Sequence, residues 1–297
     1  MSAGDGVAVA ALEVPEPLAL AGLSLHLDAV SEAEETALLA LIDSQPWDAT
    51  LKRRTQHYGC RFDFRRKTVD PSAAAPPVPA GLGAIVRRLL AAEPPLLPWG
   101  RASSPERLQV TIIEYPPGIG IAPHVDTHSA FADGIGALTL GAGVAFRMQQ
   151  REAAADYAVW LPERSLLVMR GAARYAWRHS ISSRRHDRVE APPTEGAGDA
   201  GCEWRPRGRR VSVTLRLVLD GEGCSCAWPQ WCDSQGGVAI ELPTRLRPDA
   251  PMCSGGEQAR EDGAIGDGEK GHARPERLGA PLSLHSSPMQ IDSQQGT

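Results

Sequence analysis

The 297-residue chain has no long apolar run, few cysteines, few aromatic residues and no excess of basic charge. No stretch approaches the roughly 20 apolar residues of a membrane span, and no basic segment followed by an apolar run opens the chain. We therefore expect a soluble protein without a membrane partner, located in the cytoplasm or also in the nucleus. The net charge of −5 argues against binding nucleic acid through bulk electrostatics, although it permits a local basic groove.

The six cysteines are too few for a disulfide scaffold in a chain of this length. Three of them, Cys224, Cys226 and Cys232, fall within nine residues. In an intracellular protein such a cluster more often binds metal than forms disulfides. The alternative is a loop that holds three reduced thiols.

Glycine and proline are abundant, at 30 and 25 residues, which indicates irregular segments beside a core. We expect a flexible lead-in over residues 1–22 and a folded domain over 23–235. The Gly/Ser/Pro-rich tail over 236–297 has too few apolar residues to offset the entropy cost of ordering, so it is predicted to be disordered.

The pattern along the domain predicts two helices and then a series of strands. Ser31 and Glu34 precede an apolar run and predict a capping box, and a second helix is expected around 85–92. Residues 71–80 are expected to form a loop, and 190–206 an inserted loop. From residue 108 onward, short apolar runs lie between Gly/Pro turns, which is typical of a barrel or sandwich. The predicted fold class is mainly β with flanking helices, and the jelly roll, or double-stranded β-helix, is one such fold.

His124 and Asp126 lie two residues apart after a predicted strand, so their side chains point to the same side. His179 follows 53 residues after Asp126. Two histidines and one carboxylate, with three metal positions left open, are the ligand set of non-haem Fe(II) oxygenases. A His-x-Asp pair alone arises often by chance, so the interpretation depends on what accompanies it.

A strand near residue 213 carries four alternating polar residues that share one face: Arg210, Ser212, Thr214 and Arg216. Guanidinium groups on an otherwise apolar strand need carboxylates or phosphates as partners. A dicarboxylate that chelates a nearby metal would suit both arginines. The alternative is an exposed strand face with solvated arginines.

These motifs, in this order, resemble the AlkB family of Fe(II)/2-oxoglutarate dioxygenases over about residues 23–235. The resemblance implies a jelly-roll enzyme that uses O₂. The residues that would bind Fe(II) are His124, Asp126 and His179. The residues that would bind 2-oxoglutarate are Tyr115, Arg210, Ser212 and Arg216. Ile113 stands where the family usually has an asparagine that hydrogen-bonds 2-oxoglutarate, which predicts weakened co-substrate binding.

Three separate blocks, 118–141, 161–181 and 224–235, are most similar to the family branch of the eighth mammalian AlkB homologue, which acts on the wobble uridine of certain transfer RNAs. The resemblance implies hydroxylation of 5-methoxycarbonylmethyluridine in a tRNA anticodon loop, with a separate tRNA methyltransferase as the source of the substrate. The alternatives are oxidative demethylation of alkylated bases in RNA or DNA, and a non-catalytic RNA-binding member of the fold. The resemblance also implies a structural Zn(II), whose ligands would be His128, Cys224, Cys226 and Cys232.

The basic stretch over residues 51–67 resembles the family's nucleotide-recognition lid. The side chains that would contact RNA are Arg53, Arg54, His57, Tyr58 and Arg61. The alternative is a solvated basic loop with core aromatic residues. Six later arginines could extend the basic surface: Arg184, Arg185, Arg188, Arg205, Arg207 and Arg209. Trp177, two residues before His179, is expected to fill the core.

Overall fold

The computed structural model describes residues 11–12, 20–50, 52–63, 68–92, 95–97, 99, 107–150, 156–190, 202–219 and 223–237. All of these belong to one compact unit, Met1–Gly255. Most of the predicted lead-in over 1–22 and of the predicted tail over 236–297 lies outside the described residues, so both stay predictions. No helix in the described part is long and apolar enough to cross a membrane.

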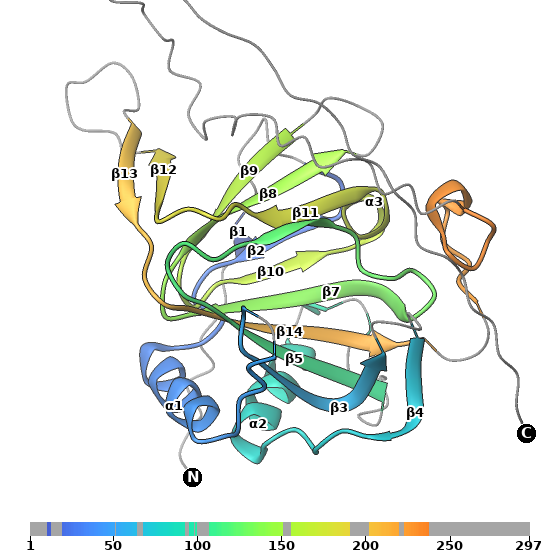
Figure 1. Ribbon diagram of the computed structural model, residues 1–297, viewed down its shortest axis with the longest axis horizontal. Coiled ribbons are helices and arrows are strands. Elements are labelled where there is room, and N and C mark those ends of the chain that lie inside the picture. The colour runs from blue at the N-terminus through green and yellow to red at the C-terminus, as the bar shows by residue number, and fades with distance from the viewer. Residues whose placement is uncertain are drawn as a thin grey trace, which may run out of the picture. The chain divides into compact units, whose positions relative to one another are not determined.

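Two antiparallel sheets face each other and form the body of the fold (Figure 1). The larger sheet has the order β1-β2-β10-β7-β14-β5-β3-β4. Its strands are β1 (Ala11–Leu12), β2 (Leu23–His26), β3 (Thr55–Asp63), β4 (Thr68–Ala74), β5 (Leu108–Tyr115), β7 (Phe131–Leu140), β10 (Leu166–Met169) and β14 (Arg210–Val218).

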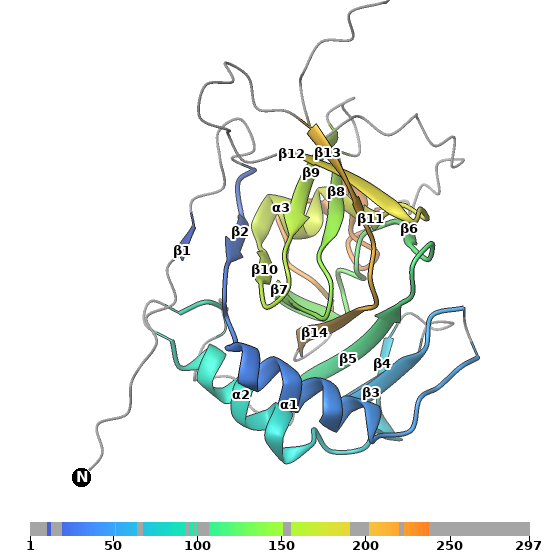
Figure 2. The ribbon, with the colours of Figure 1, turned by 90° about the vertical axis from the view of Figure 1, so that its left-hand side faces the viewer.

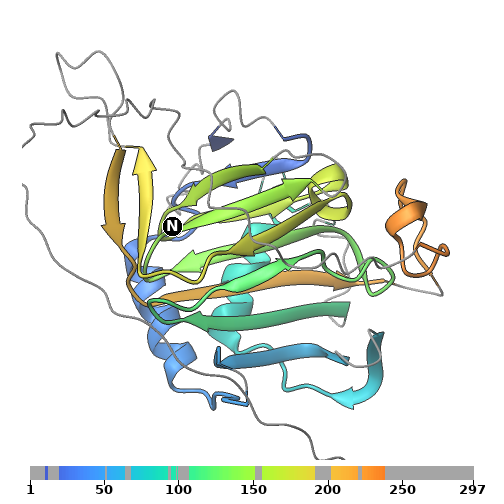
Figure 3. The same ribbon diagram turned by 45° about the horizontal axis from the view of Figure 1, so that its top comes forward.

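The smaller sheet has the order β6-β11-β8-β9. Its strands are β6 (Ile121–His124), β8 (Val144–Gln150), β9 (Asp156–Leu161) and β11 (Trp177–Ile181). A separate hairpin of β12 (His186–Glu190) and β13 (Cys202–Pro206) projects from one end of the sandwich (Figure 3). The predicted jelly-roll class, mainly β with flanking helices, is confirmed.

Helices α1 (Glu32–Asp43) and α2 (Ala80–Leu90) cover the outer face of the larger sheet (Figure 2). The predicted capping box opens α1, because the Ser31 hydroxyl accepts from the Glu34 N–H and the Glu34 carboxylate accepts from the Ser31 N–H. Leu38 of α1 and Leu82 of α2 lie in one buried cluster with the outward-facing residues of the sheet. A short helix, α3 (Gly171–Tyr175), and a 3₁₀ turn (Pro229–Trp231) complete the described elements.

Two of the loop expectations are wrong in part. Residues 71–74 continue β4, because β4 is the edge strand of its sheet and a proline there, Pro71, need not donate to a further strand. The second helix begins at Ala80, before its expected start. Within 190–206, residues 202–206 form β13, which pairs with β12, while 191–201 lie outside the described residues.

Candidate active site

The structure brings the three expected iron ligands together. Strands β6 and β11 are antiparallel neighbours, and His124 and His179 are paired directly across them. Their ring centroids lie 4.2 Å apart. Asp126 follows β6 by two residues, and one ligand atom from each of the three side chains lies within 4.8 Å of the others. The strand pairing therefore assembles a two-histidine, one-carboxylate group from segments that are far apart in sequence.

The histidine rings are oriented by contacts behind them. The Nδ1 of His124 lies 2.8 Å from the Ala122 carbonyl oxygen, which can only accept, so Nδ1 carries the proton. The Nε2 of the same ring faces Asp126 Oδ1 at 3.8 Å. The ring of His179 stacks on Phe146 with centroids 5.7 Å apart. A metal-binding histidine uses this arrangement, in which the second nitrogen fixes the tautomer and leaves the first available.

The local charges favour the protonation states that a metal needs. Burial alone would raise the pKa of Asp126, but Arg216, followed by His179 and His124, holds that pKa below its usual range. The Arg216 Nε donates to Asp126 Oδ2 at 2.8 Å. Burial, followed by the neighbouring His124, lowers the pKa of His179 to about 3. An ionised carboxylate and a neutral imidazole are the forms that coordinate a cation, so the donor set fits Fe(II).

A cavity of about 340 Å³ lies beside this group, between the two sheets. Arg210, at the start of β14, lines the cavity and is only 4% exposed. Its Nη2 donates to Thr139 Oγ1 at 3.0 Å and to Ser212 Oγ at 3.4 Å, and its guanidinium lies 5.2 Å from the centroid of the Tyr115 ring. Within the described part of the chain, no carboxylate pairs with Arg210 and its Nε has no hydrogen-bond partner.

Burial lowers the pKa of Arg210 to about 10, so the guanidinium is still charged at neutral pH. A buried cation without an anionic partner is costly, and a carboxylate entering the cavity would supply that partner. Arg210, Tyr115 and Ser212 therefore fit the dicarboxylate. The expected contact of Arg216 with 2-oxoglutarate stays a prediction, because its Nε donates to Asp126. Ile113, which replaces the expected asparagine, also lines the cavity and is paired across the strands with Ser212.

The expected RNA-contacting side chains do not all face the cavity. Arg53 and His57 line it, and Arg53 Nη1 donates to the Gly120 carbonyl at 2.6 Å. Tyr58 is buried in the core beneath the helices, and its hydroxyl donates to Gln56 Oε1 at 3.0 Å. The expectation that Tyr58 contacts RNA is therefore corrected: neighbouring residues of a strand point to opposite faces, so His57 and Tyr58 cannot both face the cavity. The Arg61 side chain lies outside the described residues.

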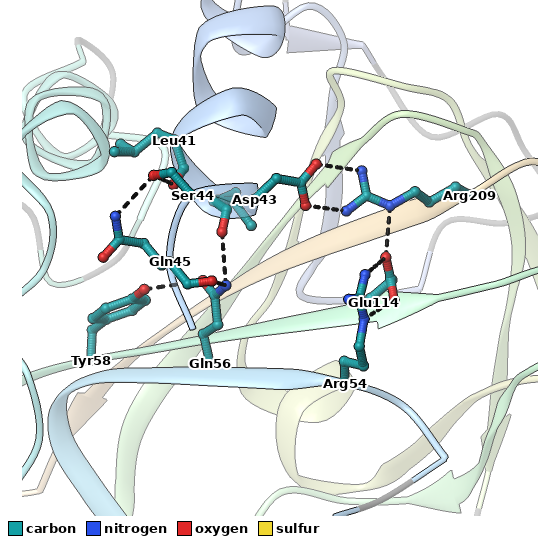
Figure 4. Close-up of polar contacts among 10 residues, drawn as sticks. Leu41, Asp43, Ser44, Gln45, Arg54, Gln56, Tyr58, Glu114 and Arg209 are labelled. Carbon is teal, nitrogen blue, oxygen red and sulfur yellow. Dashed lines mark hydrogen bonds and ion pairs between the residues drawn. The ribbon is translucent and has the colours of Figure 1, made fainter. Parts of the chain in front are cut away.

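Arg54 belongs to an ion-pair network that joins α1 to β5 and to the residues just before β3 and β14 (Figure 4). Its Nε and Nη2 each donate to the Glu114 carboxylate at 2.6 Å. Arg209 donates to the same carboxylate at 2.7 Å and to both oxygens of Asp43 at 2.6 and 3.0 Å. Arg54 and Arg209 therefore hold structural partners at the strand ends next to Tyr115 and Arg210.

Other arginines expected to enlarge a basic surface also have internal partners. Arg207 is buried and donates to both oxygens of Asp187 at 2.7 Å, and Arg184 donates to the same carboxylate at 2.8 Å. Trp177 is buried and packs on Tyr157 with ring centroids 5.3 Å apart, which confirms its expected place in the core.

The expected zinc ligands converge around His128, which lies two residues after Asp126. One ligand atom each from His128, Cys226 and Cys232 lies within 4.8 Å of the others, and the Cys226 Sγ is 3.5 Å from His128 Nδ1. Cys224 is outside that set but packs in the same small buried cluster as Cys232. Burial raises the pKa of the Cys224 thiol to about 12. Histidine and cysteine donors at this separation suit Zn(II), which would also replace the thiol protons.

Sequence reasoning missed several residues that support the site. Thr139 contacts Arg210, and Gln109 and Thr111 accept from Arg216. Asp233 accepts from the N–H groups of His128 and Ser129, at 3.1 Å each. No local pattern marks these residues, because each acts on a segment distant in sequence.

Comparison with known proteins agrees with this geometry. A family model described as "2OG-Fe(II) oxygenase superfamily" matches residues 44–216, more than half of the chain. The chain is 36% identical over 242 residues to the Arabidopsis thaliana "Alkylated DNA repair protein ALKBH8 homolog", a match that covers 75% of this chain and 65% of that protein. It is 37% identical over 230 residues to the Macaca fascicularis "tRNA (carboxymethyluridine(34)-5-O)-methyltransferase ALKBH8", covering 72% of this chain and 33% of that protein.

The chain thus spans less than two thirds of the length of these two relatives. It is also 26% identical over 238 residues to the human "Alpha-ketoglutarate-dependent dioxygenase alkB homolog 4", which extends the similarity to a further AlkB homologue. The family match spans the His-Asp-His group and both arginines of β14. The chain belongs to the 2OG-Fe(II) oxygenase superfamily, and it is a 2-oxoglutarate-dependent dioxygenase similar to AlkB homologues.

Proposed function

We propose that this dioxygenase hydroxylates the side chain of 5-methoxycarbonylmethyluridine at the wobble position of transfer RNA. The reaction class rests on one observation above all: Arg210 is a buried cation that faces the cavity without a described carboxylate partner, beside the His-Asp-His group. The substrate rests on similarity to relatives whose name places their action on carboxymethyluridine 34 of tRNA.

The residues that would hold the cofactors are placed for distinct tasks. Bound Fe(II), 2-oxoglutarate and O₂ would supply the oxidation of a C–H bond, coupled to conversion of 2-oxoglutarate to succinate and CO₂. Arg210 would hold the distal carboxylate of the co-substrate, with Tyr115 and Ser212 beside it. Arg216 keeps Asp126 ionised and fixes its orientation. Phe131 is one of the apolar residues that line the cavity and limit the access of water.

The product follows from the position of the target carbon. That carbon belongs to the uridine side chain and carries no nitrogen, so the hydroxyl stays on the nucleoside. Oxidation of an N-methyl group would instead release formaldehyde. Arg53 and His57 are the expected RNA-contacting residues that line the cavity, where a guanidinium can bind phosphate or an acyl oxygen and an imidazole can stack on a base.

Further assignments belong to the same proposal. The anticodon loop is the partner, because RNA recognition usually targets splayed bases in loops. A separate tRNA methyltransferase supplies the methyl ester, in the cytoplasm or also in the nucleus. His128, Cys226, Cys232 and the adjacent Cys224 hold a structural Zn(II).

Nucleoside mass spectrometry tests the reaction. Transfer RNA that contains the methyl ester is incubated with protein, Fe(II), 2-oxoglutarate, ascorbate and air. We expect one added oxygen on that nucleoside, lost in Asp126→Asn. Asp28→Asn is the matched control, since it removes a carboxylate whose side chain is 71% exposed and pairs with Arg164. Succinate without oxygen on the nucleoside would refute the substrate, and formaldehyde from N-methylated RNA would favour demethylation.

A further inference from the structure

Arg174 of α3 is a buried arginine, with 1% of its surface exposed. It lies next to the segment that follows β6 and carries Asp126. Its Nη1 donates to the Asp126 carbonyl oxygen at 2.7 Å, and its Nη2 donates to the Thr127 carbonyl oxygen at 2.8 Å. Both acceptors belong to the backbone, one of them to the metal-ligand residue itself. The guanidinium therefore holds, through two hydrogen bonds, the main chain that carries the Asp126 carboxylate.

Burying this cation costs free energy, so its presence is not explained by a contribution to the stability of the fold. Within the described residues, no carboxylate forms an ion pair with Arg174, and its Nε has no hydrogen-bond partner. Burial lowers the pKa of Arg174, which shows the same unfavourable environment. An apolar side chain of similar volume would fill the space at lower cost. The two carbonyl contacts are thus what this arginine provides.

The Asp126–Thr127 segment needs contacts from outside the sheets to fix its position. Strand β6 ends at His124 and β7 begins at Phe131, so sheet pairing does not hold Asp126 and Thr127. The Asp126 carboxylate is fixed on one side by Arg216 at 2.8 Å. Arg174 fixes the backbone of the same segment, and the two arginines together set the direction of the carboxylate.

The same helix also reaches the thiol cluster. The ring of Tyr175 stands edge-on to His128 with centroids 4.9 Å apart and stacks on Trp228 at 5.4 Å. The Arg174 guanidinium lies over the Tyr175 ring, 4.7 Å from the ring centroid. Helix α3 therefore touches both ends of the loop that runs from Asp126 to His128.

We propose that Arg174 is a positioning residue that holds the Asp126–Thr127 backbone so that the carboxylate faces His124 and His179. It touches neither metal nor substrate, and it sets the metal affinity of the site. The inference rests on the metal site of the proposed function but not on its RNA substrate.

Binding of Mn(II) to the full-length protein, followed by electron paramagnetic resonance, tests this role. Mn(II) prefers carboxylate oxygen to thiolate, so it reports the site that contains Asp126 rather than the cysteines. We expect Arg174→Met to weaken Mn(II) binding about 10- to 100-fold, the usual effect of losing a group that orients a ligand. Arg174→Lys, which keeps a donor for one carbonyl, should recover part of the affinity.

Arg147→Met is the matched control. Arg147 is also a buried arginine, but it pairs with Asp156 on the smaller sheet and lies outside the cavity lining. We expect this variant to lose thermal stability and to keep its Mn(II) affinity. Equal losses of Mn(II) binding in the two methionine variants would mean general loosening and would overturn the role of Arg174.

Two more measurements keep the result interpretable. If Arg174→Met does not fold, hydrogen exchange of Arg174→Lys should show faster exchange confined to the loop around residues 125–129, and unchanged exchange there would overturn the proposal. If Asp126→Asn binds Mn(II) as tightly as the wild type, the metal lies elsewhere, and both this inference and the metal site are refuted. Failure of the tRNA assay alone would leave the Mn(II) result standing.

Discussion

Glu114 is the centre of the ion-pair network in Figure 4, and its replacement by glutamine gives a quantitative test of that network. The carboxylate side chain is 7% exposed and accepts from two nitrogens of Arg54 and one of Arg209. Glutamine keeps the shape and one acceptor oxygen, but it removes the charge. Both arginines are then left without their buried anion.

The size of the effect follows from the burial of each partner. Hydrogen bonds to charged groups contribute about 1.5–3 kcal/mol each when they are shielded. The Arg54 and Arg209 side chains are 44% and 38% exposed, so water screens the ion pairs and rehydrates the arginines in the variant. We expect a total loss of about 2 kcal/mol, which corresponds to a fall in Tm of about 4–8 °C for a domain of this size.

The pH dependence gives a second signature. Hydrogen bonds from Arg54, and then from Arg209, lower the pKa of Glu114 despite its burial. A carboxyl whose folded pKa lies below the unfolded value of about 4.3 stabilises the fold above that value. This stability is lost as pH falls through the folded pKa. The difference between wild type and Glu114→Gln should therefore be constant from neutral pH to about pH 5 and shrink in more acidic solution.

Thermal denaturation across this pH range measures both quantities. Glu203→Gln is the matched control, because Glu203 pairs with Arg205 at the surface, where both side chains are 43% exposed and such pairs contribute about 0–1 kcal/mol. A Glu114→Gln variant no less stable than Glu203→Gln would refute the network's role. A destabilisation that stays unchanged in acid would show that packing, rather than charge, is responsible.

Three further outcomes are expected. Arg210→Met removes an unpaired buried cation, so it should keep or raise the Tm of the free protein while weakening 2-oxoglutarate binding about 100-fold, for a lost contact of about 3 kcal/mol; calorimetric titration measures this. Ile113→Asn should tighten 2-oxoglutarate binding about fivefold, since one added hydrogen bond contributes about 1 kcal/mol; equal affinities of variant and wild type would show that Ile113 does not weaken the binding. Cys226→Ser should release zinc and lower the Tm by at least about 4 °C, whereas Cys60→Ser should keep the metal; elemental analysis and melting curves decide.

Local and periodic signals predicted residues that the structure brings together at the cavity. The His-x-Asp pair and the alternating face of β14 are short patterns whose geometry follows from strand periodicity, and the structure places both on the cavity. The capping box at Ser31 was equally local. What the sequence left open was which strands become neighbours. The direct pairing of His124 with His179 depends on that topology.

Long-range polar contacts could not be predicted in the same way. Glu114 gathers its partners from Arg54, 60 residues away, and Arg209, 95 residues away. The basic stretch around Arg54 was interpreted as an RNA-contacting surface, because a sequence shows the charge of an arginine but not the carboxylate that pairs with it. Tyr58 was different, since strand alternation could already have separated it from His57.

The partners of the arginines also resolve the contrast between an acidic chain and an anionic co-substrate. Arg207 and Arg147 are buried with carboxylates, so their charges are neutralised inside the protein. The cavity is lined by three arginines, Arg53, Arg210 and Arg216, and by a single carboxylate, Asp126. A net charge of −5 is therefore compatible with a local positive potential, because the negative groups lie elsewhere. Attraction of 2-oxoglutarate follows from that local excess, and a bound divalent cation would increase it.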